Sequence, residues 1–217
     1  MATLNPVNEK SGVWRGTTAE ERVLPRRRKL VEAGFELLAE HGQAGTTVRG
    51  VCARANLNAR YFYESFDDLD ALLRAVFDDI LVETTERTLA AIAAAPPTAE
   101  AKTRAALEAC IRHITDDPRR IRIVFAEAAD GALGRQRAAV VERTAAMMAD
   151  QAASFFGIDR RDKLLNSATL MITGGIGELL VAWSNGGTGL TVDELIEHAT
   201  LMTIGTSRAL ARQRTGV

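Results

Sequence analysis

The sequence contains little cysteine, few aromatic residues and only three histidines. Cys52 and Cys110 lie far apart in the 217 residues, a spacing that matches neither a disulfide framework nor a structural metal site. His41, His113 and His198 form no pair at metal-ligand spacing, and no Gly-x-Ser-x-Gly motif occurs. We therefore predict no catalytic residues, no metal site and no cofactor, so an enzyme is not expected.

A long hydrophobic run and an excess of charge of one sign are also absent. The chain has 27 Lys and Arg against 28 Asp and Glu, and 47% of its residues are hydrophobic, as in ordinary globular proteins. The most apolar stretch, residues 167–177, is followed directly by Glu178, so it is short for a membrane span. The first residues lack the basic and apolar pattern of a signal peptide. We predict a cytoplasmic protein without membrane association.

The charge is unevenly distributed along the chain. Positions 26–63 hold seven basic and three acidic residues, and positions 64–86 hold eight acidic residues and one basic residue. A basic segment next to an acidic one suggests a surface for a polyanion, although two solvated helix faces explain the same pattern.

Hydrophobic periodicity predicts an all-α protein of about nine helices. From Pro25 onward apolar residues recur at three- and four-residue spacing, and no stretch alternates with the period of a strand. Gly42 would stop the first helix, Thr46 or Thr47 would cap the second, and Asn58 would cap the third. Asp67 or Asp68 would cap a long helix that runs to Ala95, and later helices are predicted at about 98–115, 118–128, 134–156, 160–184 and 191–213. The predicted domains are a flexible arm (1–22), a helix-turn-helix DNA-binding domain (23–75) and an effector-binding and dimerisation domain (76–217).

The second and third predicted helices are joined by a tight turn at Asn56, where Asn tolerates a left-handed backbone. Two helices in this arrangement present the second one to the DNA major groove. Arg60 could donate two hydrogen bonds to a guanine, and Tyr61 or Tyr63 could contact a thymine methyl or a phosphate. A surface helix with half-packed aromatic residues is the alternative interpretation.

The segment ANLNARYFYESF at positions 55–66, preceded by LVEAG at 30–34 and TV at 47–48, resembles the N-terminal domain of the TetR family of bacterial transcription regulators. The resemblance covers about residues 26–75. It implies a homodimer with two DNA-binding heads and a helical body that holds a small effector, whose binding releases the operator. Against the family pattern, Asn56 replaces a Gly, Asn58 a Ser, Ser65 a His and Leu69 a Lys, and the last change removes one expected phosphate contact.

The candidate DNA-binding residues are chosen on three grounds: this resemblance, the positive charge of the basic run, and the position of Thr46 and Thr47 at a helix N-terminus, which favours binding of a phosphate. The resemblance assigns Thr47 and Tyr63 to phosphates and positions 58–61 to bases. The full set is Arg28, Lys29, Thr46, Thr47, Asn58, Ala59, Arg60, Tyr61 and Tyr63.

An effector pocket in the body needs apolar walls and a few polar groups. Its candidates are polar residues within apolar helices, together with Met and aromatic residues for the walls, although each Met or aromatic residue is more often part of the hydrophobic core. The ligand candidates are His113, Phe125, Glu127, Met148, Phe155, Asn166, Met171 and Trp183. Small and apolar residues of the last two helices are candidates for a dimer interface, with packing inside the chain as the alternative. These are Gly174, Gly177, Leu195, Ala199 and Met202.

The sequence thus predicts a DNA-binding transcriptional regulator, a repressor that leaves a near-palindromic double-stranded DNA operator when an apolar small molecule binds. The alternative is a helical ligand-binding protein or adaptor that kept the helix-turn-helix shape without DNA binding.

Overall fold

The computed structural model describes residues 19–126 and 131–215. These described residues form nine α-helices, one short π-helical segment and no strand, so the predicted all-α class is confirmed. The elements are α1 (Ala19–Gly45), α2 (Val48–Ala55), α3 (Ala59–Tyr63), α4 (Leu69–Ala94), α5 (Ala99–Thr115), α6 (Pro118–Ile121), the π-helical segment η1 (Arg122–Ala126), α7 (Gly131–Phe156), α8 (Lys163–Ser184) and α9 (Val192–Thr215).

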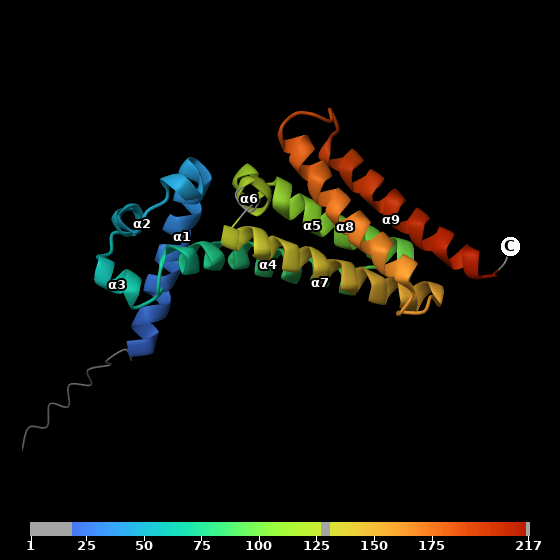
Figure 1. Cartoon of the computed structure of the whole chain (residues 1–217), viewed down its shortest axis with the longest axis horizontal. Coiled ribbons are helices and arrows are strands. Elements are labelled where there is room, and N and C mark those ends of the chain that lie inside the picture. Colours follow the sequence, from blue (N-terminus) through green and yellow to red (C-terminus); the bar gives the residue numbers. More distant parts are fainter. Residues whose placement is uncertain (1–18, 127–130, 216–217) are drawn as a thin grey trace, which may run out of the picture.

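Helices α1 to α3 form a head at one end of an elongated molecule, and α5 to α9 form a body of long helices beside it (Figure 1). The helix α4 runs from the head into the body, so the predicted domain boundary at residue 75 falls inside one continuous helix. Helix α1 begins at Ala19, within the predicted arm, and the first 18 residues lie outside the described part.

Local sequence signals account for the head. The Thr47 hydroxyl accepts a hydrogen bond from Gly50 N at 3.1 Å and caps α2, and the Asn58 side chain accepts one from Tyr61 N at 3.2 Å and caps α3. Asn56 between them has φ 52° and ψ 45°, the left-handed conformation predicted for the turn. At Gly42 φ is 70°, which ends the straight part of α1 as predicted, although one more turn continues to Gly45.

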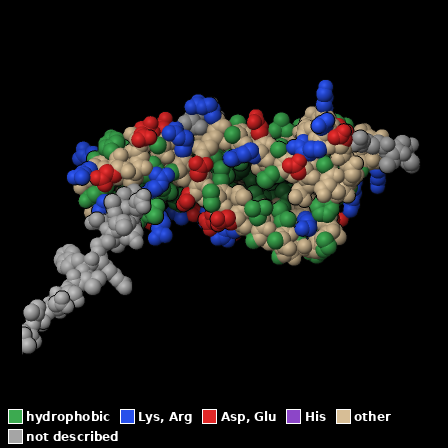
Figure 2. Space-filling model, turned by 90° about the horizontal axis from the view of Figure 1, so that it is seen from below, with side chains coloured by type: hydrophobic (Ala, Val, Ile, Leu, Met, Phe, Trp, Pro, Cys, Tyr) green, Lys and Arg blue, Asp and Glu red, His purple; other side chains and the backbone are tan. Residues whose placement is uncertain are grey.

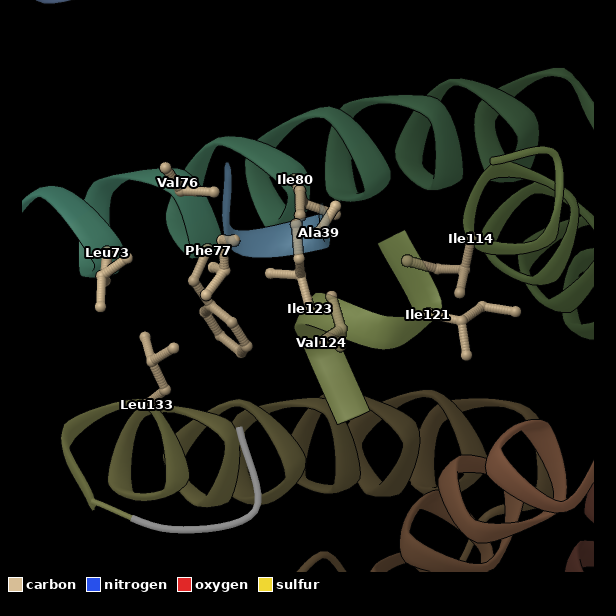
Figure 3. Packing of buried hydrophobic residues seen from close by; sticks show 11 residues of the cluster. Ala39, Leu73, Val76, Phe77, Ile80, Ile114, Ile121, Ile123, Val124 and Leu133 are labelled. Carbon is tan, nitrogen blue, oxygen red and sulfur yellow. The ribbon is translucent and has the colours of Figure 1, made fainter. Parts of the chain in front are cut away.

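A hydrophobic cluster at the junction of head and body joins the two parts. In this junction cluster, Phe77 and Ile80 of α4 pack together with Ala39 of α1. The cluster also contains Val124 of η1 and Leu133 of α7 (Figure 3). Because these side chains are buried together, a shift of the body helices changes the packing under the head.

The segment predicted as one helix over 118–128 has a different geometry. The Asp117 carboxylate caps α6 as the Asp-Pro pair predicts, but from Arg122 the chain continues as η1. Arg122 Nη1 donates a hydrogen bond to the Ala39 carbonyl of α1 at 2.6 Å, and the Arg119 guanidinium lies 4.8 Å from the centre of the Phe35 ring. This segment therefore contacts the head directly.

Candidate nucleic-acid surface and ligand cavity

Helix α3 lies on the surface of the head with its sequence-predicted outer residues exposed. Phe62 is fully buried and anchors the helix, and its ring packs edge-to-face with the Tyr63 ring, with 5.3 Å between the ring centres. Asn58 and Ala59 are exposed, the Arg60 side chain is 82% exposed, and Tyr63 is 60% exposed. An exposed cationic and aromatic helix on a rigid support suits contact with a nucleic-acid groove.

The Arg60 guanidinium is held by its neighbour one turn later. Its Nε donates to Glu64 Oε1 at 2.9 Å, and the other Glu64 oxygen lies 3.8 Å from Arg26 Nη1. The Arg26 guanidinium also stacks 3.9 Å from the centre of the Tyr61 ring, which leaves Tyr61 half-buried. This contact engages the Nε of Arg60, and the two terminal nitrogens of a guanidinium group match guanine O6 and N7.

The basic run at 26–29 divides into two pairs. Arg26 contacts Tyr61 of α3. Arg27 contacts the segment after α3, where its Nη1 donates to the Ser65 carbonyl at 2.9 Å and its guanidinium lies over the Phe66 ring. Arg28 and Lys29 are exposed to solvent. The first pair therefore joins α1 to α3 and the segment that follows it, and the second pair adds positive charge to the surface.

The two threonines before α2 lie in different environments. Thr47 is exposed at the helix N-terminus. Thr46 is only 3% exposed, and its hydroxyl donates to the Gly42 carbonyl at 2.8 Å. The inclusion of Thr46 among the DNA contacts is therefore corrected: its side chain stabilises the end of α1. Leu69 packs against the head core, so no phosphate contact comes from that position.

A cavity of about 410 Å³ lies inside the body, between α4, α5, α7, α8 and α9. This volume is in the usual range for small-molecule sites. On the face seen in Figure 2, hydrophobic side chains line a hollow in the body. Of the predicted ligand residues, Met148 and Phe155 line the cavity.

His113 lies in the core outside the cavity lining. It is 3% exposed, and its Nε2 is 3.7 Å from Glu83 Oε2, a separation beyond hydrogen-bond distance. Burial lowers the pKa of His113, and the positive charge of Arg120 lowers it further, which favours the neutral imidazole.

The remaining ligand candidates have structural positions elsewhere. The Phe125 ring fills the space beside Gly177, where an added Cβ would lie 3.2 Å from it, and Trp183 Nε1 donates to the Leu190 carbonyl at 2.8 Å. Asn166 is exposed, and its amide donates to the Asp162 carbonyl at the start of α8. Met171 is 76% exposed. These four residues do not line the cavity, and Glu127 lies outside the described residues.

The search for polar residues within apolar helices also predicts Thr169 of α8, which lines the cavity, but it missed other hydroxyl residues of the wall. These include Thr84 and Thr88 of α4 and Thr203 and Ser207 of α9. Each hydroxyl donates to the carbonyl four residues earlier. Because their protons are used inside the helices, these threonines present mainly methyl groups and oxygen lone pairs to a ligand. Hydroxyl residues repeated at four-residue spacing in apolar helices were the available signal.

The half-buried Cys110 also lines the cavity. Burial raises its pKa to about 11, so the thiol is protonated at neutral pH. It contributes polarizable surface rather than a nucleophile.

Helices α8 and α9 each carry large apolar side chains that are exposed to solvent. These are Leu170 and Met171 of α8, and Leu201 and Met202 of α9, and they are called here the outer face of the two helices. An added Cβ at Gly174 would meet no atom within 4 Å. Helix α8 is also long and apolar enough to cross a membrane by length and composition, with 22% of its most apolar window buried.

Three predicted dimer residues lie inside the chain instead of on this face. Gly177 packs against Phe125, and Leu195 and Ala199 belong to a buried cluster with Leu180. Their small or apolar side chains serve packing within the chain, which corrects their prediction as interface contacts. Gly174 and the 65% exposed Met202 remain on the outer face.

Comparison with known proteins adds two results. Residues 30–76 match the family model described as bacterial regulatory proteins, tetR family. The sequence has no significant match among curated proteins.

Solved structures resemble most of the chain. A protein from Pseudomonas aeruginosa PAO1 has 20% sequence identity and a TM-score of 0.72, over 88% of this chain and 94% of that chain. A TetR-like transcriptional regulator from Rhodococcus sp. RHA1 has 14% identity and a TM-score of 0.65, over 82% and 93%. The regulator FadR from Bacillus subtilis, solved in complex with stearoyl-CoA, has 17% identity and a TM-score of 0.69, over 81% and 97%. At sequence identities this low, the structural similarity establishes a shared fold alone.

Proposed function

We propose that this chain is a cytoplasmic, homodimeric protein that binds a specific DNA sequence. The match of residues 30–76 to the TetR-family domain, and the likeness of the fold to TetR-like transcriptional regulators, support this proposal. The protein acts as a repressor that leaves its operator when a small apolar effector binds in the body. The observation that carries this proposal is the combination of the exposed, capped helix α3 with an apolar cavity of ligand size.

In the proposed complex, α3 enters the major groove and Arg60 reads a guanine through its terminal nitrogens. The pairing of Arg60 Nε with Glu64 supports this role, because it restricts the guanidinium before DNA arrives. Thr47, Tyr63, Arg28 and Lys29 contact phosphates and fix the register.

The dimer is proposed to form when a second copy covers the apolar face of α8 and α9. Two-fold symmetry would bring Met171 and Met202 of both copies into one four-helix contact, and Gly174 would permit close approach of the helices. The low burial of α8 within the chain supports this arrangement, because an exposed apolar helix of 22 residues requires a cover in water.

The effector is proposed to act through α4 and the junction cluster. Thr84 lines the cavity, and Ile80, one turn earlier, packs in the junction cluster under the head. A ligand that moves α4 therefore changes the packing around Ala39 and Phe77 and the spacing of the two heads. The complex of the Bacillus subtilis FadR with stearoyl-CoA supports a lipid-like ligand for this fold.

The experiment that tests the proposed function is selection of bound duplexes from a random DNA library by the purified full chain. Affinities for the selected duplex and a scrambled duplex are then measured at two salt concentrations. An enriched inverted repeat that is bound much more tightly than the scramble is expected. Weak and equal binding to both duplexes would contradict the proposal and favour a ligand-binding protein or adaptor without DNA binding.

A further inference from the structure

The two charged residues among the described residues of the cavity wall differ in whether their charge is paired with an opposite charge. Only Lys102 and Asp150 are charged among the described residues that line it. Asp150 accepts a hydrogen bond from Arg160, which pairs its charge. The Lys102 ammonium forms no ion pair with a carboxylate in the described part of the chain, and its Nζ donates a long hydrogen bond of 3.4 Å to the Ile92 carbonyl.

Lys102 lies at one end of an elongated space. Along α4 the lining runs from Leu81, next to the head, to Ile92, which contacts Lys102. Eleven residues at the helical rise correspond to about 16 Å. Between these ends the wall contains mainly aliphatic groups, among them Leu89, Leu107 and Ile172.

We propose that the effector is an aliphatic monocarboxylate, a fatty acid whose carboxylate pairs with Lys102 while its chain lies along the apolar wall towards Leu81. This inference rests on the proposed function and names the ligand of the same cavity. A cation beside apolar walls favours an anion joined to an apolar body, because the chain gains burial while the head group gains a charged hydrogen bond.

The charge of the cavity wall also favours a free fatty acid over its coenzyme A thioester as the ligand. Coenzyme A carries several phosphate charges, but the described residues of the wall supply one cation without an ion pair, Lys102. Arg208, next to the lining residue Ser207, is already paired with Glu100 at 2.9 Å. The cavity therefore matches a single negative charge.

The test is calorimetric titration of the full chain, without DNA, with palmitate, hexadecanol and palmitoyl-CoA. The variants are Lys102→Met, Lys102→Arg and the control Lys163→Met, which changes an exposed lysine outside the cavity lining. We expect Lys102→Met to weaken palmitate binding by about tenfold to a hundredfold and to leave hexadecanol binding unchanged. Lys102→Arg should restore palmitate binding. Circular dichroism melting checks that each variant is folded.

Equal affinity of wild-type protein for palmitate and hexadecanol, or equal palmitate affinity of wild type and Lys102→Met, would overturn the inference. Tighter, Lys102-independent binding of palmitoyl-CoA would also overturn it. Since these titrations contain no DNA, they separate the two proposals. If the protein selects an operator but does not bind palmitate, the proposal of a fatty-acid effector is refuted and the proposed function stands. If palmitate binds in a Lys102-dependent manner but no operator is selected, the proposal of a DNA-binding regulator is refuted.

Discussion

Arg60 is the side chain on which sequence preference depends in the proposed DNA complex. We predict that Arg60→Ala costs about 1–3 kcal/mol at one base pair of each half-site and relaxes the preference there, because a bidentate contact with guanine is lost. Tyr63→Phe should weaken binding to all duplexes alike, since its hydroxyl is proposed to contact phosphate. Fluorescence anisotropy with the operator and single-base variants measures both effects.

The exposed Arg104 of α5 provides the matched control, because Arg104→Ala removes a surface charge far along the chain from α3. Losses that are equal for every sequence in both Arg60→Ala and Tyr63→Phe would contradict this division between base and phosphate contacts.

His113 predicts a pH dependence of stability. Burial, with Arg120 and Arg87, lowers its pKa in the folded chain, while Glu83 and Asp116 oppose the shift. The unfolded chain therefore binds a proton near pH 6.5 that the folded chain binds only at lower pH. The stability from the neutral imidazole is present above this range and decreases as the pH falls from about 6.5 towards the folded pKa.

We expect the free energy of unfolding to fall when urea denaturation is repeated at about pH 5.5 instead of about pH 7, and His113→Gln should reduce this fall. The variant His198→Gln, at an exposed position of α9, is the control. An identical pH dependence in wild type and His113→Gln would show that another group is responsible.

At the level of elements, the turn between α2 and α3 depends on one backbone conformation. Asn56 has φ 52°, and the next residue, Leu57, donates its N–H to the Cys52 carbonyl at 2.9 Å. We predict that Asn56→Val lowers the free energy of unfolding by about 1–2 kcal/mol, because a β-branched residue is strained in the left-handed region. Asn56→Gly should retain the wild-type value or exceed it.

Chemical denaturation of both variants measures this effect. Asn185 after α8 is a matched control, since it also follows a helix but has φ −87°, outside the left-handed region. Equal destabilisation by Asn56→Val and Asn185→Val would indicate that the loss comes from the Asn side chain rather than from the backbone conformation.

For the whole molecule, the proposed dimer predicts that charge on the outer face of α8 and α9 separates the copies. Met202→Glu should shift the protein from dimer to monomer in sedimentation velocity and weaken binding to a full operator more than to a half-site. Its fold should remain intact, because Met202 is 65% exposed in the single chain.

Val82→Glu is the control, since Val82 is a similarly exposed apolar residue of α4. A wild-type chain that sediments as a monomer, or a Met202→Glu variant that remains dimeric, would contradict this interface. Association of the wild-type protein with lipid vesicles would instead favour a membrane contact of α8.

The sequence by itself determined the features whose causes are local. Helix periodicity, the caps at Thr47 and Asn58, and the left-handed turn at Asn56 involve groups within a few residues of one another. The same short-range pattern carries the resemblance over the head, and it separated the buried Phe62 from the exposed Arg60.

Only the tertiary structure decided which residues of the body face a cavity, the core or solvent. Leu195 and Met202 lie on one apolar helix, but the first is buried against α8 neighbours and the second is exposed, because the packing of distant helices selects the inner side. The position of Lys102 on the wall of the cavity, without an ion pair in the described part of the chain, likewise appears only when five helices surround one space. The spacing of a single sequence carries little information on long-range packing, so the sequence placed Met148 and Phe155 on the cavity wall but left most of the wall unassigned.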